Sequence, residues 1–316
     1  MTIMNEQKIH LWPQLDYQQL KETIATVHMW TQMVGKVRLI QTPWINHSWH
    51  VTLYVSPIGL TTGSIPYHEG SFQIDLDFID HQLHIFTSAG KKTSFSLGAK
   101  TIAGFYIELM DNLKAVGIDT AIYAVPNEVE PAIPFLENHI PCTYHADVMH
   151  NYWQALVKIN NVFTKFRAVF DGKCSPVHFF WGAFDLAVTR FSGRKAPLHP
   201  GGAPNIPVAV MQEAYSQEVS SCGFWPGSDQ YPNPAFYAYC YPTPNDFGAQ
   251  KVAPEGAFYS KEMGEYLLPY HVVQQAADPE ASLLGFLQTT YNAAAVTGNW
   301  DKSLQCDLSG LKTSVE

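Results

Sequence analysis

The sequence predicts an α+β protein in which helices flank antiparallel sheets. Three observations lead to this class. Apolar residues recur every three or four positions in several long segments, which is typical of helices with one buried face. Other segments alternate apolar and polar residues, which is typical of half-buried strands. Turn-forming residues separate some of these strands closely enough for hairpins, so we expect antiparallel pairing.

The first half of the chain is expected to place strands between two helices. In chain order we expect a helix, a strand, a hairpin of two strands, a second helix and a further strand, over residues 15–38, 50–55, 72–78, 83–88, 101–115 and 118–124. The first strand of the hairpin is the clearest. There Phe72, Ile74 and Leu76 lie on one face, while Gln73 and Asp75 lie on the other.

The second half is expected to begin with another long helix. In chain order we expect a helix, a long strand-like run, a short helix or strand, two strands and a last helix, over residues 146–170, 177–191, 208–219, 236–241, 266–268 and 279–297. The strand-like run is too long and too apolar for one exposed strand, so we expect Gly182 to form a bulge or bend. Asp278 is a good N-cap, and Pro279 suits the first position of the last helix.

We therefore divide the chain into two α+β halves, residues 1–127 and 142–300. A proline- and glutamate-rich connector, 128–141, joins them, and a flexible tail, 301–316, follows. Arg38 is followed by His50 in the first half as Arg167 is followed by His178 in the second, at nearly the same spacing. One interpretation is an internal duplication, with similar halves related by a pseudo-twofold axis around a shared cleft. The alternative is two unrelated helix-to-strand transitions.

Composition restricts the partners and the compartment. The net charge of −9 excludes wholesale binding to nucleic acid or to anionic membranes. The sequence contains neither the ~20 apolar residues in a row that a membrane span needs nor a secretory signal. The five cysteines are scattered without a CxxC pair, which indicates free thiols in a reducing cytoplasm. We expect a cytoplasmic protein that binds a small molecule, with self-association into a homo-oligomer left open.

Basic residues gather in one stretch of this acidic chain. Of the four arginines, Arg167, Arg190 and Arg194 lie close together, and Lys173 lies between them. The planar guanidinium group suits a carboxylate or phosphate. We therefore predict that Lys173, Arg190 and Arg194 contact an anionic substrate. The alternative is that the arginines form structural salt bridges.

Two residues are candidates for acid–base catalysis. His178 lies within the basic stretch, and Glu218 precedes a small-residue loop that ends near Trp225. A carboxylate beside aromatic walls can have a raised pKa and act as an acid. We predict that Trp225 and Tyr239 stack against the substrate. The alternatives are a structural role for the histidine and, for the tyrosine, an interface between domains or subunits.

A divalent metal is the cofactor that the sequence brings into consideration; it identifies no other. His47 and His50 lie near a loop–strand junction, and Asp75 and Asp77 share one face of the next strand. Two histidines and a carboxylate can bind a metal such as zinc or iron. The alternative is a solvated polar face of a sheet. No phosphate-binding loop or nucleophile elbow is present, which disfavours standard nucleotide enzymes and α/β-hydrolases.

Several segments together resemble one family. They are His28-Met-Trp-Thr-Gln32, Gly35-Lys36, Asn46-His47-Ser-Trp-His50, Ile74-Asp-Leu-Asp-Phe-Ile-Asp-His81, Gly172-Lys-Cys-Ser-Pro-Val-His-Phe-Phe-Trp-Gly182 and Gly223-Phe-Trp-Pro-Gly227. The chain resembles a bacterial family defined as a domain of unknown function (DUF5996). The resemblance covers nearly the whole chain and implies a single unit of about this size. It implies no activity and no catalytic residues.

These observations lead to three hypotheses of function. The first is an enzyme that acts on a small anionic or aromatic substrate by histidine–carboxylate acid–base chemistry in a cleft between the halves. The second is a non-catalytic protein that binds a small ligand in the same cleft. The third is a structural oligomer whose tyrosines lie at an interface.

Overall fold

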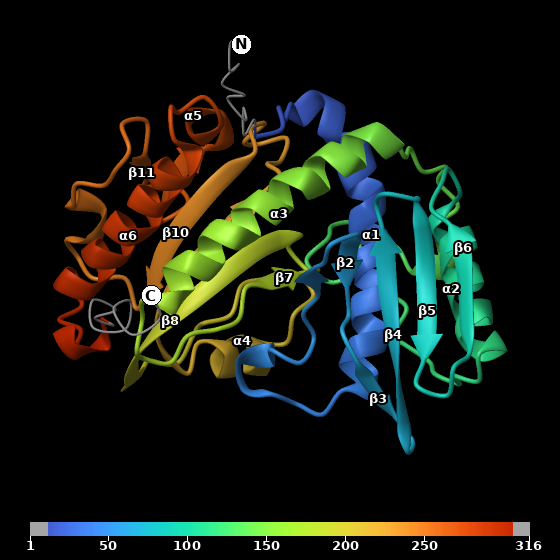
Figure 1. Ribbon diagram of the computed structural model, residues 1–316. Helices are drawn as coiled ribbons and strands as arrows, with labels where there is room; N and C mark the ends of the chain where they lie inside the picture. Colours follow the sequence, from blue (N-terminus) through green and yellow to red (C-terminus); the bar gives the residue numbers. More distant parts are fainter. Residues whose placement is uncertain (1–11, 306–316) are drawn as a thin grey trace, which may run out of the picture.

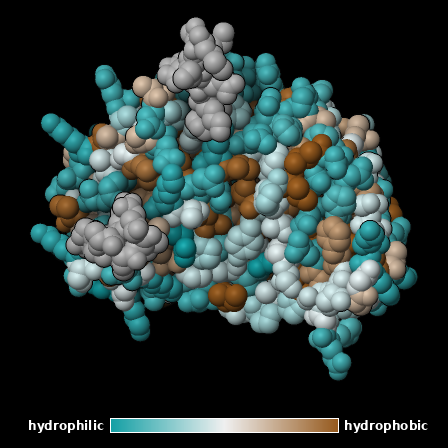
Figure 2. All heavy atoms as spheres, in the orientation of Figure 1, coloured by the Kyte–Doolittle hydropathy of each residue, from teal (hydrophilic) through white to brown (hydrophobic). Residues whose placement is uncertain are grey.

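The structure of the protein is a computed structural model that describes residues 12–305. Within these residues, two six-stranded antiparallel sheets each carry helices on one face (Figure 1). This arrangement confirms the predicted α+β class. Figure 2 shows one side of the molecule, where hydrophilic residues predominate and hydrophobic residues form small separate groups.

The N-terminal sheet follows the first long helix, α1 (Tyr17–Gln41). Its strands are β1 (Tyr54–Val55), β2 (Gly59–Thr61), β3 (Ile65–Tyr67), β4 (Gly70–Asp77), β5 (Gln82–Thr87) and β6 (Lys92–Ser96). They lie in the order β1-β2-β4-β5-β6, with β3 also paired to β4. Helix α2 (Ile102–Ala115) comes next. Trp30 of α1 stacks on Phe105 of α2 with the ring centres 4.8 Å apart, so aromatic side chains join the two helices.

The C-terminal sheet follows the second long helix, α3 (Ala146–Ala168). Its strands are β7 (His178–Phe180), β8 (Asp185–Lys195), β9 (Gln217–Trp225), β10 (Ala235–Tyr241), β11 (Phe258–Ser260) and β12 (Glu265–Pro269). They lie in the order β11-β12-β10-β9-β8-β7. The remaining helices are α4 (Val208–Ala214), α5 (Tyr270–Gln274), α6 (Pro279–Thr297), and the short 3-10 helices η1 (Asn46–Ser48), η2 (Phe135–Glu137), η3 (Phe247–Ala249) and η4 (Lys302–Leu304).

Helices α3 and α6 cover one face of this sheet and contact β8, β9 and β10 (Figure 1). Helix α3 buries Leu156, Ile159 and Phe163, which recur every three or four residues on one side of the helix. Asp278 caps α6 by accepting a hydrogen bond from the backbone amide of Ala281 at 3.0 Å, as the sequence predicts. Loops and α4 lie on the other face of the sheet.

The two sheets meet edge to edge. Leu53, just before β1, and Phe179 of β7 exchange two backbone hydrogen bonds of 2.9 Å. Each half has a long helix, an antiparallel set of strands and a further helix, but the pseudo-twofold relation between them stays a prediction. His178 opens β7, whereas His50 lies in a turn before β1. The two histidines thus do not hold the same place in an element.

Four predicted elements differ from the structure. The strand expected over 50–55 is reduced to β1, because the chain first turns through residues 49–51. The run 177–191 is a hairpin, β7 and β8, that turns at residues 181–184 around Gly182. Residues 118–124 form no strand, because no neighbouring strand pairs with them. The segment 208–219 divides into α4 and the start of β9.

Only the first residues of the predicted C-terminal tail can be compared with the structure. The expected tail, 301–316, falls mainly outside residues 12–305; its first part forms η4, and Gln305 bridges to Phe170. None of the helices in the described part of the chain is long and apolar enough to cross a membrane.

Candidate functional site

A cavity lies over the face of the C-terminal sheet that α3 and α6 leave free. It has a volume of about 670 Å³, which is in the range of pockets that hold drug-sized ligands. Alternate residues of β8 line it, namely Asp185, Ala187, Thr189 and Phe191. The residues between them face the helices, as expected from the two-residue period of a strand.

Small side chains at the centre of the sheet make room for this cavity. Ala187 pairs with Gly223 across β8 and β9, and Thr189 pairs with Ser221 in the next row. These four residues project little above the sheet, while larger side chains stand around them. The cavity therefore forms because the residues at the centre of this face of the sheet are small and those around them are large.

Nine tryptophan, phenylalanine and tyrosine side chains line the cavity. They are Trp44, Trp49, Phe180, Trp181, Phe191, Tyr215, Trp225, Tyr237 and Tyr239. Trp181 is fixed by its indole N–H, which donates to the carbonyl of Val51 at 2.7 Å. A Cβ atom at Gly35 would lie 2.2 Å from the Trp181 ring, so only glycine lets the ring pack this closely on α1. Residues of α4 and the preceding loop, among them Ile206, Val210 and Met211, cover the cavity from the other side.

Asp185 is a buried carboxyl group in the wall, with one tyrosine donor. Tyr237 of β10 leans over Gly223 of β9, and its hydroxyl donates a hydrogen bond to Asp185 of β8. A Cβ atom at Gly223 would lie 2.3 Å from Cζ of that tyrosine ring, so glycine is required for this crossing. Burial raises the pKa of Asp185 to about 6, although the hydrogen bond from Tyr237 acts in the opposite direction.

Glu128 places a second carboxyl group in the wall. Its backbone adopts the left-handed conformation, with φ of 57°, which is uncommon for a residue other than glycine. A Cβ atom at Gly182 would lie 2.0 Å from Oε1 of Glu128, so the carboxyl group occupies space that the glycine leaves. Burial, and secondarily the charge of Asp185, raise the pKa of Glu128 to about 7.

Helix α1 holds the backbone next to Glu128. The amide of Asn127 donates to Oε1 of Gln32 at 3.0 Å, and the Gln32 side chain donates to the Asn127 carbonyl at 2.7 Å. The ammonium group of Lys36 donates to the Asn127 side chain. The Glu128 amide donates to the carbonyl of Pro204 at 3.0 Å. A strained residue that several elements fix in this way is typical of a functional site.

Glu265, at the start of β12, is the third carboxyl group in the wall. Burial, and then the charge of Asp185, raise its pKa to about 7. None of these three acids forms a salt bridge within residues 12–305. The salt bridges there are His84–Asp77, Lys100–Glu108, Lys165–Glu280 and Arg194–Glu218. Among the described residues, none of the three acids thus has a salt-bridging cation; by exposed area Asp185 is buried, and Glu128 and Glu265 are half-buried.

Hydroxyl groups form short chains beside the acids. The hydroxyls of Tyr215 and Tyr239 are 2.8 Å apart, and those of Thr189 and Ser221 are 2.9 Å apart. Burial raises the pKa of Tyr239 well above its ordinary value, so this group stays protonated. These hydroxyl groups thus give the cavity neutral hydrogen-bond donors and acceptors in addition to its carboxyl groups.

A different set of groups lies at the Phe191 end of the cavity. His47 of η1 lines the cavity there, and its Nδ1 is 2.9 Å from the carbonyl of Ala214. The ammonium group of Lys173 lies 2.5 Å from Nε2 of His47 and 4.7 Å from the centre of the Phe191 ring. Lys173 is not among the residues that line the cavity. Burial lowers the pKa of both basic groups.

The three cations predicted for an anionic substrate do not share a cleft. The alternation of side chains along β8 places Arg190 on the helix side, where it is fully buried with its guanidinium 3.5 Å from the centre of the Phe166 ring. Arg194 instead binds Glu218, with Nη2 and Oε2 2.7 Å apart. Two residues predicted for different roles are thus partners of each other, outside the cavity.

His178, the predicted catalytic base, is also placed outside the cavity. Its ring packs edge-on against Trp49, Tyr54 and Phe180 and is 1% exposed. Among residues 12–305, neither ring nitrogen has a hydrogen-bond partner. Burial, and then the charges of two nearby arginines, lower the pKa of His178 to about 3. By contrast, Trp225 and Tyr239, the predicted stacking residues, both line the cavity.

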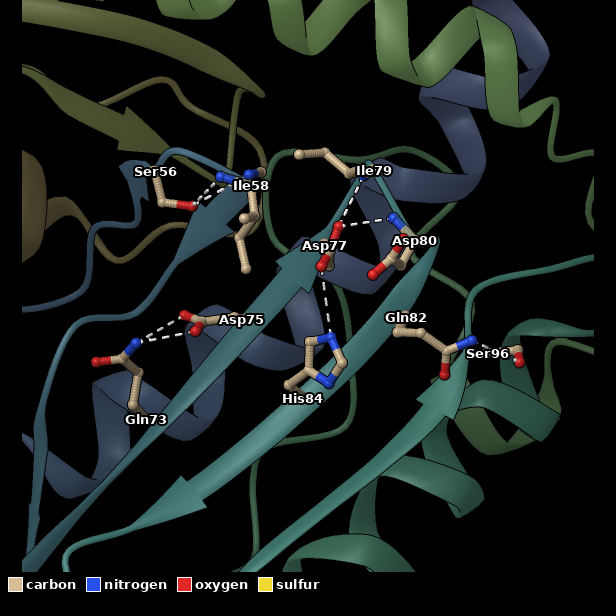
Figure 3. Close-up of polar contacts among 11 residues, drawn as sticks. Ser56, Ile58, Gln73, Asp75, Asp77, Ile79, Asp80, Gln82, His84 and Ser96 are labelled. Carbon is tan, nitrogen blue, oxygen red and sulfur yellow. Dashed lines mark hydrogen bonds and ion pairs between the residues drawn. The ribbon is translucent and has the colours of Figure 1, made fainter.

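The four residues predicted to bind a metal have separate partners. Asp75 accepts two hydrogen bonds of 2.9 Å from the Gln73 amide (Figure 3). Asp77 accepts hydrogen bonds from the backbone amides of residues 79 and 80, and lies 3.5 Å from Nε2 of His84 (Figure 3). His50 accepts a hydrogen bond from the backbone of residue 45, and His47 is at the cavity. Within residues 12–305, no three His, Cys, Asp or Glu side chains are grouped closely enough to hold a metal ion.

Sequence reasoning missed Glu128 and Glu265 as site residues. Glu128 lies in the segment predicted as a connector, and Glu265 lies outside the strand core predicted at 266–268. Asp185 was not predicted as a site residue either. The pairing register of β8, β9, β10 and β12 would have identified Asp185 and Glu265. It shows which side chains lie together on the face of the sheet that α3 and α6 do not cover.

Comparison with known proteins gives one match. A model described as a family of unknown function, DUF5996, matches residues 12–306. No curated protein and no solved structure matches the chain.

Proposed function

The chain belongs to the DUF5996 family, whose function is unknown, and from the cavity we propose that it binds a small organic cation with an apolar or aromatic body. One observation carries this proposal. Among the described residues, those lining the cavity include the acids Glu128, Asp185 and Glu265 but neither lysine nor arginine. The electrostatic field in such a cavity favours a positively charged ligand.

Burying a carboxylate without a partner is unfavourable, so without a bound cation the acids of the cavity are partly protonated. The raised pKa values of Glu128 and Glu265, about 7 in each case, express this cost. A ligand ammonium group would supply the missing counter-charge and form charge-assisted hydrogen bonds. Its binding would therefore favour ionisation of the acids.

The aromatic wall suits the rest of such a ligand. Rings such as Trp49, Trp181 and Trp225 offer apolar contact area and a negative π face, which attracts cations. Tyr237 and Tyr239 face the cavity, and this supports a ligand-binding role for them over an interface between subunits. An anionic ligand is less well supported, because Arg190 and Arg194 lie elsewhere.

Acid–base catalysis on the bound cation is our second candidate. It is favoured by the pKa values of Glu128 and Asp185, about 7 and about 6, which lie near neutral pH. A group that transfers protons works best when its pKa is near the working pH. In this proposal the two acids take the roles that the sequence suggested for His178 and Glu218.

Three probes with the same aromatic body but different charge would test the binding proposal. They are phenethylamine, phenethyl alcohol and 3-phenylpropionate, measured by calorimetry with the full chain at pH 7.5. We expect phenethylamine to bind at least tenfold more tightly than the alcohol, a difference of ~1.4 kcal/mol, and the acid to bind least. Equal or tighter binding of the alcohol or of the acid would contradict the proposal.

We also propose that the protein acts in the cytoplasm. The four cysteines within residues 12–305, namely Cys142, Cys174, Cys222 and Cys240, are free, which supports a reducing compartment. Localisation of a tagged full-length chain by cell fractionation would check this.

A further inference from the structure

We infer that the ligand carries two cationic nitrogen centres joined by an apolar chain, a diamine or a related dication. This inference rests on the proposed function and specifies its ligand class. It starts from the positions of the three carboxyl groups, which come from three separate segments: the loop at Glu128, strand β8 at Asp185 and strand β12 at Glu265.

The three carboxyl groups do not meet at one point. Strands β9 and β10 separate β8 from β12, which puts these two strands ~14 Å apart at ~4.8 Å per step. The pairing register aligns Leu186 with Leu268, three residues along β12 from Glu265, so the backbones of Asp185 and Glu265 are farther apart than the strands themselves. The same three acids are also not grouped closely enough to hold one metal ion. An ammonium group donates hydrogen bonds over only ~3 Å. One cationic centre therefore cannot neutralise all three acids.

Two of the acids lie at the same end of the cavity. The Glu128 carboxyl group packs against Gly182 in the turn that leads into β8, and Asp185 is the first residue of β8. A first cationic group would bind between these two carboxyl groups. Glu265 lies towards the other edge of the sheet and would bind the second group.

The surface between the two ends suits an apolar linker. Tyr237 and Tyr239 of β10, the strand next to β12, stack with ring centres 6.1 Å apart and an angle of 16°. Both rings line the cavity, as does Trp225 on β9. Methylene groups crossing this surface would contact aromatic faces, which would exclude water from the carboxyl groups at each end.

The inference can be tested with the full chain and two matched series of probes. One series consists of α,ω-diamines from 1,3-diaminopropane to 1,8-diaminooctane, and the other of amino alcohols of the same lengths. Calorimetry at pH 8 gives each affinity. We expect affinity to peak at one chain length, where the diamine binds at least tenfold more tightly than its amino alcohol.

Two variants test whether Glu265 binds the second cationic group of the ligand. Glu265→Gln should reduce the advantage of the best diamine over its amino alcohol to less than threefold. Glu262→Gln, an exposed acid three residues earlier, should keep the full advantage and serves as the control. The series on the unmodified protein does not depend on how well these variants fold.

The outcomes separate this inference from the proposed function. Equal affinity of diamines and amino alcohols at every length would overturn the inference and leave cation binding intact. Binding of phenethylamine without binding of any diamine would also overturn the inference alone. If neither phenethylamine nor any member of the two series binds, both the inference and the proposed function are wrong.

Discussion

Replacing Glu128 with glutamine should stabilise the protein at alkaline pH while weakening its affinity for cations. Glutamine has nearly the same shape as glutamate and keeps the same backbone, so the change removes mainly the charge. Burial and the charge of Asp185 raise the pKa of Glu128 from 4.5 to about 7 in the folded protein. Because the folded pKa is the higher one, the contribution of this group to stability is fully present below pH 4.5. It is lost as the pH rises through 7.

The magnitude follows from this rise of about 2.5 in pKa. One pKa unit corresponds to ~1.4 kcal/mol, so the ionised carboxylate destabilises the fold by about 3 kcal/mol above pH 8. At pH 5 the same relation leaves about 1 kcal/mol or less. Unfolding entropy grows with chain length, and for a chain of this size 3 kcal/mol corresponds to roughly 5 °C in melting temperature.

Thermal and urea unfolding at pH 5 and pH 8.5 would measure this difference. Glu128→Gln should melt roughly 5 °C above the unmodified protein at pH 8.5 and nearly level with it at pH 5. Glu69→Gln, which alters an exposed acid, should change neither value. A melting temperature for Glu128→Gln that is unchanged at pH 8.5, or raised equally at both pH values, would show that an ionised Glu128 does not destabilise the folded protein.

Three further substitutions test the packing around the cavity. Gly182→Ala should displace the Glu128 carboxyl group, because the new Cβ would lie 2.0 Å from Oε1, and calorimetry should show at least threefold weaker binding of phenethylamine. Gly223→Ala should push the Tyr237 ring away from its acid and lower stability by ~1–3 kcal/mol, as urea unfolding would measure. Arg190→Lys should lower the melting temperature, because the stacked guanidinium is lost, but change phenethylamine affinity less than twofold. A change in affinity without a change in stability would restore the arginine to a ligand-binding role.

Most of the secondary structure could be predicted because its signals are local. The period of three or four residues identifies α1 and α3, and the alternation of Phe72, Ile74 and Leu76 identifies β4. Strand β1 and residues 118–124 could not be judged in this way, because strand formation depends on a partner elsewhere in the chain. The same dependence explains why the turn at 181–184 was read only as a bulge or bend.

The site was harder to predict because its residues meet only through the fold. Trp225 and Tyr239, which line the cavity, were singled out because they belong to locally aromatic segments, and their contact with a ligand stays a prediction. Glu128 and Glu265 carry no local signal, since each is a single acid near the end of an unremarkable segment. Arg190 was misleading for the opposite reason. Clustering in sequence suggested a shared cleft, but alternation along β8 turns it towards α3 and α6.

Counting the protons released when phenethylamine binds at pH 6.5 would show directly whether carboxyl groups of the cavity are the counter-charges of a bound cation. Calorimetry in buffers that differ in ionisation enthalpy gives this number. Glu128, with a pKa of about 7, is mostly protonated in the absence of ligand at this pH and must ionise to pair, together with Asp185, with the single cationic group of phenethylamine. We predict the release of roughly one proton by the unmodified protein and a smaller release by Glu128→Gln. Binding with no proton release, or with proton uptake, would contradict the account.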